Sequence, residues 1–83
     1  MSAEQRALDA GYEGIMLFSN YDDALIGFTE DERAVYDYDK MVECLMEEEG
    51  WSYDDAIEWI EYNTIRSLPY MGPKAPIVMH PVE

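Results

Sequence analysis

Two rows of carboxylates stand at helical spacing in this 83-residue chain, and they are the residues best placed to do chemistry. The first acid row consists of Asp39, Glu43 and Glu47, and the second acid row consists of Asp54, Glu58 and Glu61. On an α-helix such intervals place the members of a row in one line, with neighbouring Cβ atoms about 5–6 Å apart. A nucleic-acid strand presents a phosphate about every 3.4 Å of its axis. The rows therefore predict a surface that a phosphate-binding groove would attract.

The overall charge excludes several classes of function. The chain has 19 acidic and 5 basic residues, which gives a formal net charge of −14, and residues 22–61 hold fifteen of the acids against Arg33 and Lys40. Direct binding to DNA or RNA needs lysine and arginine contacts to phosphates, so it is excluded. An anionic membrane surface is disfavoured for the same reason. The expected partner is a protein with a basic nucleic-acid-binding cleft.

Catalysis is not expected, because the chemical groups for it are missing. A nucleophilic pair of Cys44 and His80 would need a mid-helix cysteine to meet a histidine four residues from the end of the sequence. The five glycines form no phosphate-binding loop. A calcium loop begun at Asp37 would place Met41 and Val42 where an oxygen ligand and a glycine are required. We expect no catalytic residue, no metal site and no cofactor.

The elements that must position the acids can be read from the pattern of apolar residues. Two apolar runs, residues 24–29 and 34–38, are separated by a polar connection of hairpin length, which predicts a β-hairpin. From Asp39 an apolar stripe at helical spacing predicts a first helix that ends at Gly50. Ser52 is the expected N-cap of a second helix.

The residues after the second helix predict a helix end followed by a short strand. Pro69 ends the helix because proline lacks the amide donor. Residues 75–79 predict a short strand at the edge of the sheet, since Pro76 cannot donate to a neighbouring strand. At the other end of the chain, residues 3–10 fit a helical turn and residues 14–18 fit a strand.

Together these elements predict an α+β fold, in which a small antiparallel sheet (the β-hairpin plus the C-terminal edge strand) packs against a two-helix hairpin. We expect residues 21–83 to form a single domain and leave the structure of residues 1–20 undetermined. The sequence shows neither a signal-peptide pattern nor an apolar run near the ~20 residues of a spanning helix. The expected location is the cytoplasm.

Aromatic side chains accompany the acids and supply the second part of the predicted binding surface. A core this small cannot bury all of Tyr38, Trp51, Tyr53, Trp59 and Tyr62. Tyrosine and tryptophan are favoured interface anchors because they bring a large area with few rotamers to freeze. We expect Trp51 and Tyr62 to contact the partner and Trp59 to flank the core. Asn63 is expected to serve as a structural hydrogen-bonding residue.

The chain also resembles a group of small, acidic, uncharacterised bacteriophage proteins over about residues 21–79. The resemblance rests on Asp22-Asp23-Ala24-Leu25-Ile26-Gly27, Ala34-Val35-Tyr36-Asp37-Tyr38-Asp39-Lys40, Ala56-Ile57-Glu58-Trp59-Ile60-Glu61-Tyr62-Asn63-Thr64 and Ala75-Pro76-Ile77. It implies a phage or prophage origin and a shared small fold. The group has no assigned activity, so the resemblance transfers no catalytic residue.

The implied phage origin, the one-sided charge and the missing catalytic groups favour an inhibitor of a host defence protein. The expected type is an anti-CRISPR or anti-restriction protein, and the expected mechanism is nucleic-acid mimicry. Two alternatives stay open. The first is a non-enzymatic phage adaptor or assembly protein that self-associates or binds a phage partner, with the charge serving solubility. The second is a binder of a small signalling molecule in an oligomeric pocket, although five basic residues are few for holding phosphates.

Overall fold

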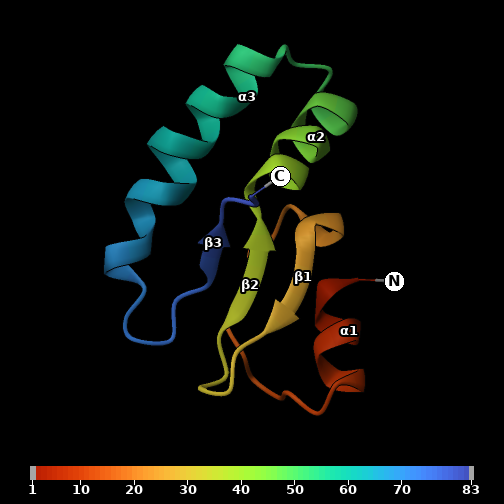
Figure 1. The fold of residues 1–83 in the computed structure, drawn as a ribbon, viewed down its shortest axis with the longest axis vertical. Helices are drawn as coiled ribbons and strands as arrows, with labels where there is room; N and C mark the ends of the chain where they lie inside the picture. The colour runs from red at the N-terminus through yellow and green to blue at the C-terminus, as the bar shows by residue number, and fades with distance from the viewer. Residues whose placement is uncertain (1, 83) are drawn as a thin grey trace.

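The computed structural model describes residues 2–82, which form a three-stranded sheet with three α-helices around it (Figure 1). The strands are β1 (Leu25–Phe28), β2 (Ala34–Asp37) and β3 (Ile77–Met79), in the spatial order β1-β2-β3. The α-helices are α1 (Ala3–Asp9), α2 (Tyr38–Glu49) and α3 (Tyr53–Trp59). The π-helical segment η2 (Ile60–Ile65) and the short 3-10 helices η1 (Asp22–Ala24) and η3 (Leu68–Tyr70) complete the described chain. The predicted α+β class is confirmed.

Strands β1 and β2 form the predicted hairpin. They pair antiparallel, with Leu25 opposite Tyr36 and Phe28 opposite Ala34, and the register shifts between Leu25 and Gly27. The connection is closed by the Thr29 amide, which donates to the Arg33 carbonyl at 2.8 Å. Alternating exposure along β2 turns Ala34 and Tyr36 into the core.

Strand β3 corrects the prediction of a wholly antiparallel sheet. It lies beside β2 as predicted, at an edge, but it runs parallel to β2, with Val35 opposite Ile77 and Asp37 opposite Met79. The reason is the connection between them. Helix α2 carries the chain away from the sheet, and α3 with η2 brings it back to the end at which β2 began (Figure 1). A parallel pair requires such a crossover, and the two-helix hairpin supplies it.

The two helices of this hairpin begin and end at the residues that their capping chemistry requires. Helix α2 starts at Tyr38, one residue earlier than predicted, because the Asp37 side chain at the end of β2 accepts from the Lys40 amide at 3.2 Å. It ends at Gly50, whose φ of 72° is the left-handed conformation expected of a C-cap glycine. Ser52 caps α3 by accepting from the Asp55 amide at 3.2 Å.

The second helix changes its winding along its length, which its sequence pattern did not predict. Helix α3 continues without a break into the π-helical η2, where each amide reaches a carbonyl five residues back. Ile60 and Thr64 lie buried within η2, as predicted for the apolar stripe. The Asn63 amide nitrogen donates to the Trp59 carbonyl at 3.1 Å, which confirms Asn63 as a structural hydrogen-bonding residue.

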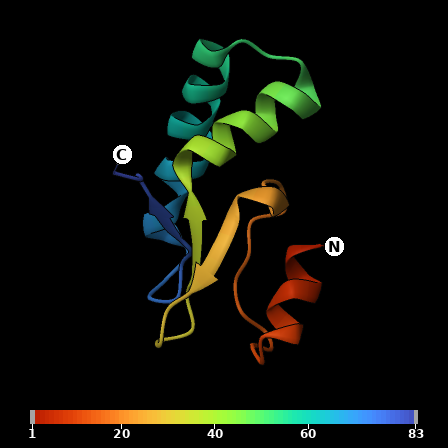
Figure 2. The same ribbon diagram turned by 45° about the vertical axis from the view of Figure 1, so that its right-hand side comes forward.

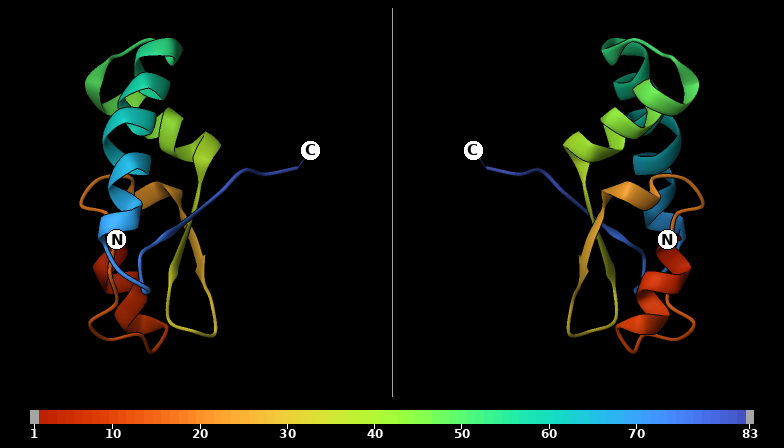
Figure 3. Two further views of the ribbon diagram at one scale, coloured as in Figure 1. Left: turned by 90° about the vertical axis from the view of Figure 1, so that its left-hand side faces the viewer. Right: turned by 90° about the vertical axis from the view of Figure 1, so that its right-hand side faces the viewer.

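The N-terminal residues form a helix that lies beside β1 (Figure 2). The Arg6 guanidinium on α1 donates to the Asp22 carbonyl at 2.9 Å and to the Leu25 carbonyl at 2.6 Å. Residues 14–18 do not form the strand that their sequence suggested. Figure 3 shows that α1 and the α3–η2 helix lie on the same side of the sheet, while the C-terminal residues leave on the other side.

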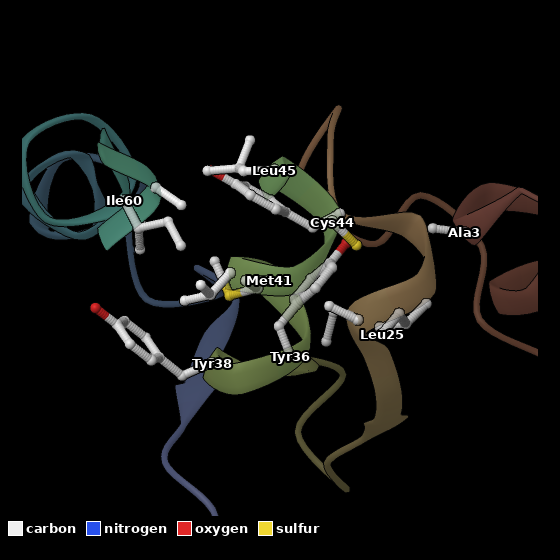
Figure 4. Packing of buried hydrophobic residues seen from close by; sticks show 13 residues of the cluster. Ala3, Leu25, Tyr36, Tyr38, Met41, Cys44, Leu45 and Ile60 are labelled. Atoms are coloured by element: carbon white, nitrogen blue, oxygen red, sulfur yellow. The ribbon is translucent and has the colours of Figure 1, made fainter. Parts of the chain in front are cut away.

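One hydrophobic cluster joins the sheet to the helices (Figure 4). Tyr36 from β2 and Met41 and Leu45 from α2 lie at its centre, and Ile60 reaches it from η2. Ala3 brings α1 into the same cluster. Cys44 is buried here on α2, and burial among apolar neighbours raises the pKa of its thiol, with Glu48 and Asp23 adding to the shift. The core therefore holds α2 at a defined angle to the sheet and to α3.

Candidate binding surface on the two-helix hairpin

The first acid row occupies the outward side of α2. Asp39, Glu43 and Glu47 are all exposed, whereas Met41 and Leu45 point into the core from the same helix. Because the helical period separates these two sets onto opposite sides, burial of the apolar stripe forces the carboxylates into solvent. The predicted row is therefore present and accessible.

The second acid row lies on α3 and η2, and its members have different surroundings. Asp54 is exposed in the first turn of α3, where the helix dipole favours a negative charge. Glu58 is exposed one turn later. Glu61 belongs to η2, and its carboxylate accepts a hydrogen bond of 2.9 Å from the Tyr38 hydroxyl. This contact links the end of the second row to the start of α2.

Tyr38 is the structural link at this point. Its side chain is 8% exposed, and its ring lies against the His80 ring with a centroid separation of 4.4 Å. Burial raises the pKa of the Tyr38 phenol to about 12, and the hydrogen bond to Glu61 and the charge of Glu61 contribute to the rise. Tyr38 therefore serves as a neutral hydrogen-bond donor that joins α2, η2 and the residue after β3, and it is not one of the accessible aromatics.

Most of the basic side chains are engaged away from this surface. Arg6 donates to carbonyls beside α1, Arg33 donates to the Ala75 carbonyl at 2.8 Å, and Lys74 donates to the Asp31 carbonyl. Residues 38–62 in contrast hold nine carboxylates, all exposed, and the single base Lys40. The net charge of the molecule is thus concentrated on the two-helix hairpin.

An open cavity of about 300 Å³ lies on the outer side of α3. Its walls include the two tryptophans of the chain, Trp51 and Trp59, whose ring centroids are 5.3 Å apart at an interplanar angle of 58°. We call it the aromatic cavity, and its lining residues are Trp51, Asp55, Glu58, Trp59, Tyr62 and Asn63. The structure therefore brings three of the predicted site residues, Trp51, Glu58 and Tyr62, into one place.

Three residues of the aromatic cavity were not among the predicted site residues. Asp55 was predicted only as an acid of the charged region, Asn63 was predicted to be a structural residue, and Trp59, expected at the edge of the core, is 41% exposed on the cavity wall. Asp55, Trp59 and Tyr62 stand at i, i+4 and i+7, the same spacing that revealed the acid rows. This spacing of one acid and two aromatic residues is the sequence signal for the cavity.

Residues 2–82 were also compared with the requirements of a metal site and of a membrane-spanning helix. Within them no group of three His, Cys, Asp or Glu side chains is arranged to hold a metal ion. None of the helices in this part of the chain combines the length and the apolar character needed to cross a membrane.

No family model matches this chain, and neither the curated proteins nor the solved structures contain a match to it.

Proposed function

We propose that this protein is a phage-encoded inhibitor that binds the basic nucleic-acid-binding cleft of a host defence protein and excludes the nucleic acid by charge mimicry. The observation that carries the proposal is the concentration of nine exposed carboxylates, with one base, on residues 38–62 of the two-helix hairpin. Like charges at i, i+4 destabilise a helix by about 0.2–0.5 kcal/mol per pair. A surface that served only the fold would interleave lysines or arginines among these acids.

The two-helix hairpin gives this charge a defined shape. Its helices are held by the core and by the Tyr38–Glu61 hydrogen bond, so the acid rows are presented on rigid elements. Complementary charge accelerates association with a basic cleft and makes it sensitive to salt. In this proposal the protein is a binding protein rather than an enzyme, and its action takes place in the host cytoplasm.

The test exchanges charge on the rows and at a distant control site. One variant carries Asp39→Lys, Glu43→Lys and Glu47→Lys, and a matched control carries Glu13→Lys, Glu30→Lys and Glu32→Lys, which are exposed and lie outside the helices. Each variant changes the formal charge by +6, from −14 to −8. A third variant carries Asp54→Lys, Glu58→Lys and Glu61→Gln, because glutamine keeps an acceptor for Tyr38.

The readout is capture of a host nucleic-acid-binding protein from lysate by the immobilised full chain, followed by elution with duplex DNA. We expect capture in about 0.1 M salt and loss in about 1 M salt. Duplex DNA should displace the captured protein, and a row variant should lose binding by orders of magnitude while the control retains it. A captured protein that stays bound in excess DNA, or that binds the row variants as well as the parent, would contradict mimicry.

One observation favours the alternative of a phage adaptor or assembly protein that self-associates. Aromatic rings remain accessible on α3 and η2, with Tyr62 63% exposed. Two copies meeting through this surface would, however, bring Asp55 and Glu58 of each copy together, and such like-charge contacts cost several kcal/mol. Sedimentation velocity distinguishes the two functions, because mimicry predicts a monomer at low salt and the adaptor predicts a dimer or larger assembly that salt strengthens.

A further inference from the structure

We propose that the aromatic cavity binds the guanidinium group of an arginine side chain presented by the protein partner. The inference deepens the proposed function, since it names the chemical group that the hairpin recognises. It rests on the composition of the cavity walls, on the packing of Trp51 against the core and on the charge around the cavity.

The walls supply the faces that a planar cation needs. Trp51 is half-buried and packs against the hydrophobic core, so its ring has a fixed position, and Trp59 is tilted against it at 58°. Tyr62 contributes a third ring. Cations bind the faces of such rings, and tryptophan is the strongest of the three aromatic types.

The carboxylates supply the matching charge. Asp55 and Glu58 stand at i and i+3 on α3, so they lie on neighbouring turns of one side of the helix and both line the cavity. A guanidinium presents five donors in a rigid fork, which suits two carboxylates, whereas an ammonium is a strongly hydrated point charge. The chemistry of the walls therefore favours arginine over lysine.

The chain itself shows that one of these rings accepts a guanidinium. The Arg66 guanidinium carbon lies 5.7 Å from the centroid of the Tyr62 ring. Arg66 is not among the lining residues of the cavity, which leaves the aromatic cavity open for a group from outside. A volume of about 300 Å³ lies at the lower end of the range for ligand sites, so it suits one side chain rather than a large ligand.

The π-helical winding contributes to the shape of the cavity. Tyr62 and Asn63 belong to η2, and the Asn63 side chain donates to the Trp59 carbonyl one turn back in the same helix. π-helical turns inside α-helices occur frequently at functional sites. The local winding therefore adds an independent reason to place a binding site here.

The test uses the intrinsic fluorescence of the full chain, because both of its tryptophans line the cavity. The probes are N-acetyl-arginine amide, N-acetyl-lysine amide and N-acetyl-glycine amide. We expect saturable binding of the arginine probe with a Kd of about 1 mM, since a single side chain offers few contacts. The lysine probe should bind several-fold more weakly, and the glycine probe should give no change.

Variants of the cavity residues, with controls outside the cavity, test whether the arginine probe binds in the aromatic cavity. Asp55→Asn combined with Glu58→Gln should weaken binding of the arginine probe by about threefold to tenfold. Trp59→Ala, followed through Trp51, should weaken it by about tenfold. The controls are Tyr70→Ala, an exposed aromatic outside the cavity, and Glu30→Gln, an exposed carboxylate outside the two-helix hairpin, and both should bind the probe as the parent does.

The outcomes separate this inference from the proposed function. The variant of the first acid row should bind the arginine probe within about twofold of the parent, even if it no longer captures the host protein. Saturable binding of the arginine probe by a parent chain that captures no host nucleic-acid-binding protein, or whose capture the row variants retain, would overturn mimicry alone. Equal binding of the lysine and arginine probes, no saturable binding of either, or equal weakening by Glu30→Gln and by the cavity variants would overturn the arginine site.

Discussion

At the scale of single residues, the fold depends on a few polar contacts between segments that are distant in sequence. Tyr38 donates to Glu61 across 23 residues, and the Tyr21 and Thr64 hydroxyls share a buried hydrogen bond of 2.8 Å across 43 residues. Within residues 2–82, Thr64 is a buried polar residue. Each contact joins the α3–η2 helix to another part of the molecule.

The raised pKa of Tyr38 predicts a loss of stability in alkali. Between the ordinary pKa of 10.0 and the folded value of about 12, the unfolded chain releases the phenol proton while the folded chain keeps it. This contribution to the free energy of unfolding is therefore fully present below pH 10 and lost as the pH rises toward 12, by about 2–3 kcal/mol. Urea unfolding at several alkaline pH values measures it.

Tyr38→Phe removes the titrating group and is the informative variant. It should be less stable than the parent near pH 8, because a hydrogen bond of about 1 kcal/mol is lost. The difference between the two proteins should shrink above pH 10 and reverse as the pH approaches 12, because the loss from Tyr38 then exceeds the free energy of the hydrogen bond. Tyr70→Phe, at a position that is 90% exposed, is the control and should follow the parent. Parallel pH dependences for the parent and Tyr38→Phe would show that Tyr38 is not the cause.

The buried pair of Tyr21 and Thr64 predicts strong coupling in a double-mutant cycle. Tyr21→Phe or Thr64→Val alone leaves one buried hydroxyl without its partner, which costs about 1–3 kcal/mol of unfolding free energy. The double variant removes both hydroxyls and should cost less than the sum of the two single changes. Additive effects, measured by chemical denaturation, would mean that water or another group satisfies the remaining hydroxyl.

At the scale of elements, short capping segments set the geometry of the two-helix hairpin. Asp37 ends β2 and caps α2, so strand and helix follow each other with no loop between them. Gly50 and Ser52 then end one helix and begin the next within three residues. The angle at which the acid rows meet is determined by these positions.

Removal of the caps should destabilise the hairpin measurably. Ser52→Ala should lower the free energy of unfolding by about 0.5–2 kcal/mol, because the Asp55 amide loses its acceptor. Gly50→Ala should also destabilise, since φ at Gly50 is 72° and an L-residue is strained there. Thermal unfolding followed by far-UV circular dichroism gives both values. If both variants are as stable as the parent, the turn between α2 and α3 does not depend on these caps.

At the scale of the whole molecule, the basic and the acidic side chains lie in different places and have different roles. Arg6, Arg33 and Lys74 bind backbone carbonyls and connect α1, the β-hairpin and the segment before β3. The acids concentrate on the two-helix hairpin, where they face solvent. The molecule is therefore held together mainly by its apolar core and backbone contacts, and its surface charge opposes folding slightly.

Salt should therefore stabilise the folded chain. Four like-charge neighbour pairs in the two acid rows cost about 1–2 kcal/mol in total at low ionic strength. Screening in about 0.5 M sodium chloride should remove much of this repulsion and raise the free energy of unfolding. Each kcal/mol of added stability corresponds to about 4–8 °C in Tm for a domain of this size. The variant of the first acid row should respond less to salt than the charge-matched Glu13, Glu30 and Glu32 variant does. Equal responses would mean that repulsion along the row is not significant.

The sequence by itself determined the features that arise from neighbours along the chain. The periodicity of apolar residues located both helices and the β-hairpin to within a residue or two, and the chemistry of Gly50 and Ser52 located the turn between the helices. The exposure of the acid rows followed from burial of the opposite stripe. These features depend on local backbone and side-chain preferences. Such preferences act over a few neighbouring residues and can therefore be inferred from the sequence.

Only the tertiary structure decided the features that join distant residues. The direction of β3 was set by the two-helix crossover, and a local reading of residues 75–79 contains no information on that direction. The bond from Arg33 to the Ala75 carbonyl and the Tyr38–Glu61 contact depend on how the helix hairpin packs on the sheet. The aromatic cavity needed both the turn that places Trp51 over Trp59 and the π-helical winding that positions Tyr62. Packing in three dimensions, which local propensity does not encode, selected these contacts from the many that the chain could have made.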